Sequence, residues 1–131
     1  MKYLMLHCFN EADFDFGDGV DVHTPESAAE EAAVGAWDAE MLERGILVGG
    51  GRLRPTGEAT TLRVRDGQVL LTDGPFAETK EQIAGYAVLE CGDLDQAIEV
   101  SARHPTGRFG TFELRPMLAV DDVPDETRAL R

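Results

Sequence analysis

The sequence is short of positive charge. Its 12 Lys and Arg residues stand against 25 Asp and Glu residues, which gives a formal net charge of −13 at pH 7. Such a field repels the phosphates of nucleic acids and the headgroups of anionic lipids, so the composition argues against a nucleic-acid partner and against a membrane partner. A cationic or protein partner stays open, and solubility alone also accounts for an acidic surface.

Long apolar runs are absent as well. The apolar stretch at residues 3–9 is far shorter than the roughly 20 residues that span a bilayer, and no small-residue cleavage signature follows it. We therefore expect a cytoplasmic protein. The length of 131 residues suits a single domain, which we place at residues 1–120, with residues 121–131 as a polar C-terminal tail.

Cysteine and histidine are scarce, and neither is clustered. Cys8 and Cys91 both lie in apolar runs typical of strands, where a reduced cysteine behaves as a small buried hydrophobic residue. His7, His23 and His104 are scattered along the chain, and no Cys-x-x-Cys motif is present. The sequence therefore predicts no metal site and no cofactor. It also lacks a phosphate loop and a Gly-x-Ser-x-Gly nucleophile motif.

The first half of the chain predicts a strand, a loop and a helix. Apolar residues on both alternate faces of residues 2–9 indicate a central strand covered on both sides. Residues 10–23 are acidic and contain glycine, which is typical of a loop. Thr24 and Pro25 supply the N-cap and first-turn proline of a helix that we expect to end near Arg44. Its apolar stripe comprises Ala29, Ala33, Ala36, Trp37 and Met41.

Three further strands and a second helix follow. Residues 46–53 and 84–91 are strand-like, and three glycines in the first of these runs permit a bulge or a close backbone approach. Residues 111–120 form the last strand, which Pro116 suits to an edge. The second helix opens with a capping box between Asp93 and Gln96. Its expected stripe comprises Leu94, Ala97, Ile98 and Ser101, with His104 at the end, where the helix dipole favours a protonated imidazole.

Between these strands, residues 60–72 predict a β-hairpin. Two alternating runs flank Asp66-Gly67, a pair favoured in two-residue turns. The predicted cross-strand pairs are Arg65 with Gln68, Val64 with Val69, Leu62 with Leu71, and Thr60 with Asp73. We expect the valine face to be buried, which would direct the Asp73 carboxylate inward.

The order of elements predicts an α+β fold on the split strand-helix-strand plan, with the hairpin inserted. The first and third strands of this plan are antiparallel neighbours. Cys8 and Cys91 then lie far apart, so we expect no disulfide. A four-stranded sheet with helices on one face leaves its other apolar face uncovered, and we expect a homodimer to bury that face.

The run TDGPFAETKEQ at residues 72–82, followed by Gly85-Tyr86, resembles the signature of the DGPF-domain branch of the YCII-related proteins. Shorter matching pieces are Met1-Lys2-Tyr3-Leu4, Leu47-Val48-Gly49-Gly50, Val64-Arg65-Asp66-Gly67 and Glu113-Leu114-Arg115-Pro116. The resemblance covers about residues 1–118. It implies a ferredoxin-like dimeric α+β barrel, in which two sheets pack face to face across a two-fold axis and each subunit has a cleft.

The resemblance also bears on function. In the wider family a His–Asp pair has been proposed as an acid-base dyad, with the histidine on the first helix. Carried over, the acid falls nearest Glu78, but the first helix of this chain holds no histidine, so only His7, His23 or His104 could replace it. Some members are encoded beside, or fused to, extracytoplasmic-function sigma factors, which implies a regulatory or ligand-sensing role and a sigma-factor association.

The candidate site residues carry alternative interpretations. Asp73 either caps the Gly-Pro turn that follows it or acts as a general base. His104 is either a structural helix-end residue or an acid. The candidate catalytic residues are Asp73, Glu78 and His104, and the candidate ligand-binding residues are Phe76, Lys80 and Arg115. Two functions stay open: a ligand-binding or regulatory module, which the missing histidine favours, and a small-molecule enzyme acting on a small anionic or polar ligand.

Overall fold

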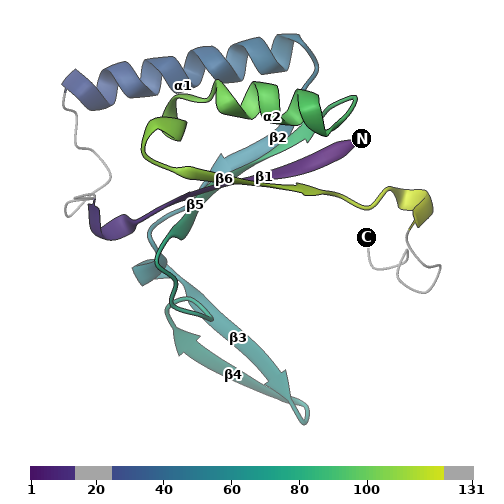
Figure 1. Ribbon diagram of the computed structural model, residues 1–131. Helices are drawn as coiled ribbons and strands as arrows, with labels where there is room; N and C mark the ends of the chain where they lie inside the picture. Colours follow the sequence, from purple (N-terminus) through teal and green to yellow (C-terminus); the bar gives the residue numbers. More distant parts are fainter. Residues whose placement is uncertain (14–24, 123–131) are drawn as a thin grey trace.

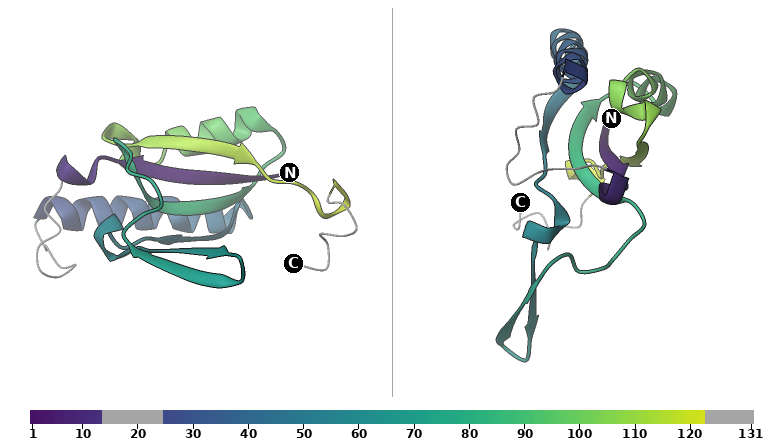
Figure 2. Two further views of the ribbon diagram at one scale, coloured as in Figure 1. Left: turned by 90° about the horizontal axis from the view of Figure 1, so that it is seen from below. Right: turned by 90° about the vertical axis from the view of Figure 1, so that its left-hand side faces the viewer.

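Four strands form one antiparallel sheet in the computed structural model, which describes residues 1–13 and 25–122. The strands are β1 (Lys2–Phe9), β2 (Leu47–Arg52), β5 (Gln82–Glu90) and β6 (Thr111–Pro116). Their order is β2-β5-β1-β6, and every neighbouring pair is antiparallel. Helices α1 (Pro25–Glu43) and α2 (Leu94–Ala102) lie on one side of this sheet (Figures 1 and 2). The fold is therefore α+β, as the sequence predicts, and is compatible with a ferredoxin-like plan.

Four short 3₁₀ turns complete the described chain: η1 (Glu11–Asp13), η2 (Thr56–Glu58), η3 (Pro105–Arg108) and η4 (Val120–Asp122). The first of these occupies the start of the predicted acidic loop. The rest of that loop lies outside the described residues, together with His23 and the N-cap predicted at Thr24. Residues 123–131 of the predicted tail lie outside them as well.

The core lies between the sheet and the helices. Along β1, Tyr3 and Met5 are buried opposite Leu89 and Ala87 of β5, because alternate residues of paired strands share a face. The buried hydrophobic residues are Tyr3, Met5, Trp37, Met41, Ile46, Ala87, Leu89, Cys91, Ala97 and Val100. Burying this apolar surface is the main term that stabilises the fold.

The opposite face of the sheet has no helix on it. Its residues are the other alternate positions of the paired strands, Leu4, Leu6, Tyr86, Val88, Glu113 and Arg115, which we call the open face. The leucines and Val88 are half-buried, whereas Tyr86 is 40% exposed. The expectation that β1 is covered on both sides is thus met on the helix side alone among the described residues.

The predicted helix stripes are only partly buried. On α1, Trp37 and Met41 are buried, but Ala29, Ala33 and Ala36 are exposed, because no described element covers that part of the helix.

On α2, the buried residues are Ala97, Val100 and Ser101, while Leu94 and Ile98 are about half exposed. The buried side of α2 is therefore rotated around the helix axis from the predicted one. It follows the helical spacing of Ala97, Val100, Ser101 and His104.

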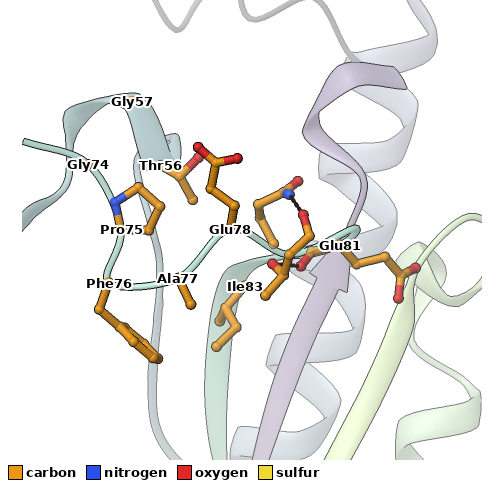
Figure 3. Close-up of a pocket in the computed structure, with 11 residues that line it drawn as sticks. Thr56, Gly57, Gly74, Pro75, Phe76, Ala77, Glu78, Glu81 and Ile83 are labelled. Carbon is orange, nitrogen blue, oxygen red and sulfur yellow. Dashed lines mark hydrogen bonds between the residues drawn. The ribbon is translucent and has the colours of Figure 1, made fainter.

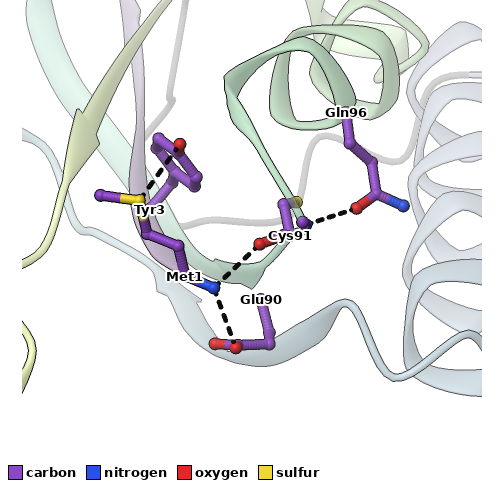
Figure 4. Close-up of polar contacts among 6 residues, drawn as sticks. Met1, Tyr3, Glu90, Cys91 and Gln96 are labelled. Atoms are coloured by element: carbon purple, nitrogen blue, oxygen red, sulfur yellow. Dashed lines mark hydrogen bonds and ion pairs between the residues drawn. The ribbon is translucent and has the colours of Figure 1, made fainter.

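Hydrogen bonds cap the start of α2, just after β5. The Asp93 side chain accepts the Gln96 N–H at 2.8 Å, as predicted. The Gln96 side chain accepts the Gly92 N–H at 2.8 Å, not that of Asp93. Nearby, the Met1 amine donates to the Cys91 carbonyl at 2.9 Å and pairs with Glu90 at 3.2 Å (Figure 4). These contacts fix β1 against the end of β5.

Glycines in β2 allow the close backbone approach that the sequence suggested. The β2–β5 register shifts between Leu47 and Gly49. At Gly50, with φ of +157°, a Cβ atom would lie 2.6 Å from the Tyr86 carbonyl oxygen. A side chain at this position would force the two strands apart, which explains why glycine stands there.

Strands β3 (Thr60–Arg65) and β4 (Gln68–Asp73) form a separate two-stranded sheet. Every predicted pair is observed, from Arg65 with Gln68 to Thr60 with Asp73. Asp66 and Gly67 both have positive φ, 50° and 76°, which is the conformation that a two-residue type I′ turn needs.

The burial predicted for this hairpin is wrong. It projects away from the helices and the four-stranded sheet (Figures 1 and 2), so its valine face meets no core. Leu62, Val64, Val69 and Leu71 are between 53% and 66% exposed, and Asp73 is exposed rather than directed inward. We call residues 60–73 the arm.

The two cysteines are free, Cys8 half-buried and Cys91 buried, as predicted from their places on antiparallel neighbours. Burial raises the pKa of the Cys8 thiol, and the carboxylates of Glu81 and Glu113 add to the rise. Neither helix in the described part of the chain is both long enough and apolar enough to cross a membrane.

Candidate functional site

A pocket of about 570 Å³ lies at the foot of the arm (Figure 3). One wall comes from η2, immediately before β3, and the other from the loop that joins β4 to β5. The lining residues are Thr56, Gly57, Gly74, Pro75, Phe76, Ala77, Glu78, Thr79, Glu81, Gln82 and Ile83. Most of the DGPF-like run therefore lines one concave surface.

Hydrogen bonds hold the two feet of the arm together. Gly74, with φ of +96°, turns the chain out of β4, and its N–H donates to the Ala59 carbonyl at 2.7 Å. The Thr61 hydroxyl donates to the Gly74 carbonyl at 2.8 Å. Because these bonds join residues next to both walls, the geometry of the pocket depends on the geometry of the arm's base.

Glu11 of η1 forms hydrogen bonds with residues of both walls. Its carboxylate accepts the Thr56 N–H at 3.0 Å and the Thr56 hydroxyl at 2.6 Å. Its own N–H donates to the Gln82 side chain at 2.8 Å, and Gln82 in turn donates to the Thr79 carbonyl at 2.5 Å. Glu11 is a positioning residue that the sequence did not reveal, because it stands in an acidic segment with no periodic pattern.

Glu78 is the polar group in the pocket that has no partner among the described residues. Its carboxylate points to the side of Thr56 and Gly57, while the Phe76 ring points the other way and is 81% exposed (Figure 3). The second carboxylate, Glu81, accepts a hydrogen bond from the Thr111 hydroxyl at 3.1 Å. The described residues that line the pocket include no Lys, Arg or His, so its charged side chains are both carboxylates.

Of the six candidate site residues, Phe76 and Glu78 line this pocket, and the other four do not. Asp73 and Lys80 are exposed on the chain beside it. Arg115 lies on the open face and donates to Glu113 at 2.7 Å.

His104 is buried in another part of the molecule, between the sheet and α1. The structure thus separates the candidate carboxylates from the candidate imidazole.

His104 belongs to a buried aromatic cluster. Its ring centroid lies 4.6 Å from that of His7 and 4.8 Å from that of Trp37, with edge-on geometry in both pairs. Phe112 contacts both histidines, at 5.2 Å from His7 and 5.5 Å from His104. His7 lies here because it shares the helix-facing side of β1 with Tyr3 and Met5, an alternation visible in the sequence.

Both imidazoles are neutral at pH 7. Burial lowers the pKa of His7 to about 4, with a further lowering from His104 and an opposing effect of Asp38. Burial, aided by Arg52, lowers the pKa of His104 to about 4 as well. The expectation that the helix dipole keeps His104 protonated is wrong, because the cost of burying the charge exceeds the dipole's effect.

The hydrogen bonds of the two histidines point to a structural role rather than a catalytic one. The Nδ1 atom of His104 accepts the Thr106 N–H at 3.2 Å and so caps η3. The Nε2 atom of His7 is buried and has no hydrogen-bond partner among the described residues. Within residues 1–13 and 25–122, no carboxylate forms a hydrogen bond with either ring, so the geometry there is not that of a His–Asp dyad. The same residues include no group of three or more His, Cys, Asp or Glu arranged to hold a metal ion.

Comparisons with known proteins place these features in a family context. The model of the YCII-related domain matches residues 1–121. An uncharacterized protein of Rhizobium meliloti (strain 1021) is 40% identical over 82 residues, which cover 60% of this chain and 64% of that protein. The match therefore spans less than two thirds of that relative's length.

Proposed function

The chain belongs to the YCII-related family, and from this premise we propose that it is a ligand-binding module whose site is the pocket at the foot of the arm. The observation that supports the proposal is the Glu78 carboxylate, which has no described partner and faces a pocket with hydroxyl groups and an exposed aromatic ring. An unpaired carboxylate near hydroxyl groups suits a polar ligand that donates hydrogen bonds.

The charge of the lining narrows the ligand class. Among the described residues, Glu78 and Glu81 are the only ionisable ones that line the pocket, so a neutral polar or cationic ligand fits it better than an anionic one. Lys80 and Arg115, which we expected to hold an anion, do not line it. We therefore propose an amine-bearing or polyhydroxylated small molecule.

Titrations followed by the backbone amide NMR signals of residues 74–83 test this proposal. The probes are ethylammonium as a cation, glycerol as a neutral polyol and acetate as an anion. We expect ethylammonium or glycerol to shift these signals and acetate to leave them in place. Glu78→Gln should weaken binding about tenfold, since a hydrogen bond to a charged group contributes about 1.5–3 kcal/mol.

Asp73→Asn is the matched control, because Asp73 is an exposed carboxylate close in sequence but outside the lining. It should leave the titration unchanged. Shifts caused by acetate alone, or equal losses in the two variants, would contradict the proposed site.

A second proposal concerns the subunit. The open face presents Leu4, Leu6, Tyr86 and Val88 with no described element over them, so we propose a homodimer that buries this face. Equilibrium sedimentation should give twice the chain mass of 14.3 kDa at micromolar concentration.

A sigma factor of the extracytoplasmic-function class remains the partner proposed from the family resemblance, to be tested by co-elution with the purified chain.

An enzymatic role is the alternative, and it rests on Glu78. A carboxylate near the Thr56 hydroxyl has the chemistry of a general base. The imidazole of His104 is an unsuitable acid for this role, because it is neutral at pH 7 and lies outside the pocket. Catalysis would therefore depend on the carboxylate and on groups of the substrate.

A further inference from the structure

The arm exposes an apolar face that its own chain does not cover. Leu62, Val64, Val69 and Leu71 share one side of the hairpin through the observed register, and each is more than half exposed. The other side carries Thr61, Arg63, Arg65, Gln68, Leu70 and Thr72. A two-stranded hairpin is marginally stable in water by itself, so a face of this kind indicates a surface that packs against a partner.

The arm and the open face are accessible from the same side of the molecule. Figures 1 and 2 show that the arm extends below the sheet, away from the two helices. The arm and the open face therefore both lie on the side that the helices leave free, where one partner can reach both.

The size of the arm determines what partner it can support. Its strands have six residues each, so at about 3.4 Å per residue and 4.8 Å between strands it measures roughly 20 by 10 Å. A stable protein interface buries about 800 Å² on each side. The arm is too small to provide this area by itself, whereas the arm together with the four-stranded open face approaches it.

The charge of the arm is compatible with a second copy of the same chain as the partner. The whole chain carries a net charge of −13, which opposes self-association. Residues 60–73 hold two Arg and two Asp, so the arm has a net charge of zero. It is therefore a segment that approaches an acidic copy of the chain without like-charge repulsion.

The arm is also joined to the pocket. Thr56 and Gly57 precede β3, Gly74 and Pro75 follow β4, and all four residues line the pocket. The bond from the Gly74 N–H to the Ala59 carbonyl ties these two feet together. A force that orients the arm therefore orients both walls of the pocket.

We propose that the apolar face of the arm packs on a second copy of this chain, and that this packing holds the two walls of the pocket in their binding geometry. The inference rests on the proposed homodimer and adds that the ligand site is complete only in it. Dimerisation then regulates the pocket through the arm, without a residue of the second copy having to enter the pocket.

The test uses the double variant Leu62→Thr/Leu71→Thr, since threonine keeps the β-propensity of the hairpin and removes its apolar surface. The matched control is Leu70→Thr, because Leu70 pairs with Arg63 on the opposite side and is 47% exposed. We expect the double variant to raise the dimer dissociation constant in sedimentation at least about tenfold, and the control to change it less than about twofold.

Hydrogen exchange measured by mass spectrometry on the same samples tests the coupling to the pocket. At a concentration where the wild-type chain is dimeric, peptides covering residues 54–59 and 74–83 should exchange faster in the double variant than in the wild-type chain or the control. Peptides of α1 and α2, which lie on the other side of the sheet from the open face, should be unchanged, which shows that the domain is folded.

The outcomes separate the inference from the proposals on which it rests. A dimer that the double variant leaves intact would overturn the role of the arm while the homodimer stands. A weakened dimer with unchanged exchange at the pocket would overturn the coupling. A monomeric wild-type chain would overturn both the homodimer and this inference, while binding through Glu78 would still be decided by its own titration.

Discussion

The pair β1–β5 and the pair β3–β4 are both antiparallel but have opposite surroundings. In each pair apolar residues lie opposite one another, as Tyr3 does with Leu89 and Leu62 with Leu71. Met5 and Leu89 of the first pair are fully buried, whereas Leu62 and Leu71 of the second are 58% and 66% exposed. Alternation therefore sets which residues share a face, whereas the burial of that face depends on which other elements cover it.

The helices account for the difference. Trp37 and Met41 of α1, with Ala97 and Val100 of α2, complete the core over β1 and β5. No described element packs in this way on the arm. Substitutions in the two pairs should therefore have very different effects on stability.

The largest expected contrast is between Leu89→Ala and Leu71→Ala. Removing the fully buried Leu89 side chain should lower the free energy of unfolding by about 2–5 kcal/mol, because the surrounding core cannot close the cavity. Leu71→Ala should lower it by less than about 0.5 kcal/mol. Urea unfolding followed by circular dichroism, at a concentration low enough to keep the chain monomeric, provides both values; similar losses at the two positions would contradict the comparison.

The buried histidines should make the core, unlike the arm, sensitive to pH. The pKa of both His7 and His104 falls to about 4 in the folded chain, from an ordinary value near 6.5 in the unfolded chain. Between these values the unfolded chain binds more protons, so stability rises with pH from about 4 to 6.5 and is fully present above that window. We expect a loss of about 2–3 kcal/mol for each histidine on acidification across it.

His7→Phe isolates this effect from the titration of the many carboxylates. Phenylalanine keeps an aromatic ring beside Phe112 and His104 but binds no proton, and it removes the buried Nε2 atom that has no described partner. Urea midpoints measured from pH 4 to pH 8 should depend less steeply on pH in the variant than in the wild-type chain. Parallel profiles for the two proteins would show that His7 does not carry the effect.

A smaller loss is expected from Trp37→Phe. The indole N–H donates to the Val100 carbonyl of α2 at 2.9 Å, and phenylalanine cannot replace that donor. Leaving a buried acceptor without its donor should cost about 1–3 kcal/mol, measured by thermal unfolding. Met41→Leu is a suitable control, because it preserves volume at a neighbouring buried site and should cost less than about 1.5 kcal/mol.

The order of helices and strands, the register of the hairpin and the start of α2 could be predicted from the sequence because they depend on local chemistry. Asp66-Gly67 sets the turn and therefore the register, and both residues adopt the positive φ that the turn requires. The Asp93 cap starts α2 as predicted. Each of these features involves residues within a few positions of one another, so periodicity and turn preferences suffice to find them.

The site was less accessible because it depends on contacts between distant residues. The bond from Thr56 to Glu11 spans 45 positions, and no local pattern marks Glu11. The inward direction of Asp73 was inferred from the register together with an assumed core, and only the register was correct. Likewise, the spacing of His104 predicted its burial but not its distance to His7, which comes from another element.

The smallest expected effect concerns the turn of the arm. Gly67 has φ of +76°, and an added Cβ would meet nothing within 4 Å, so Gly67→Ala should introduce backbone strain of about 1–2 kcal/mol and no clash. Since the arm makes few contacts with the core, this strain should open the arm locally and lower global stability by less than about 0.5 kcal/mol. Hydrogen exchange should then accelerate in residues 60–73 and remain unchanged in β1 and β5. Equal acceleration in both would mean that the arm and the four-stranded sheet unfold as one unit, so that the exposed strand pair contributes to the stability of the buried one.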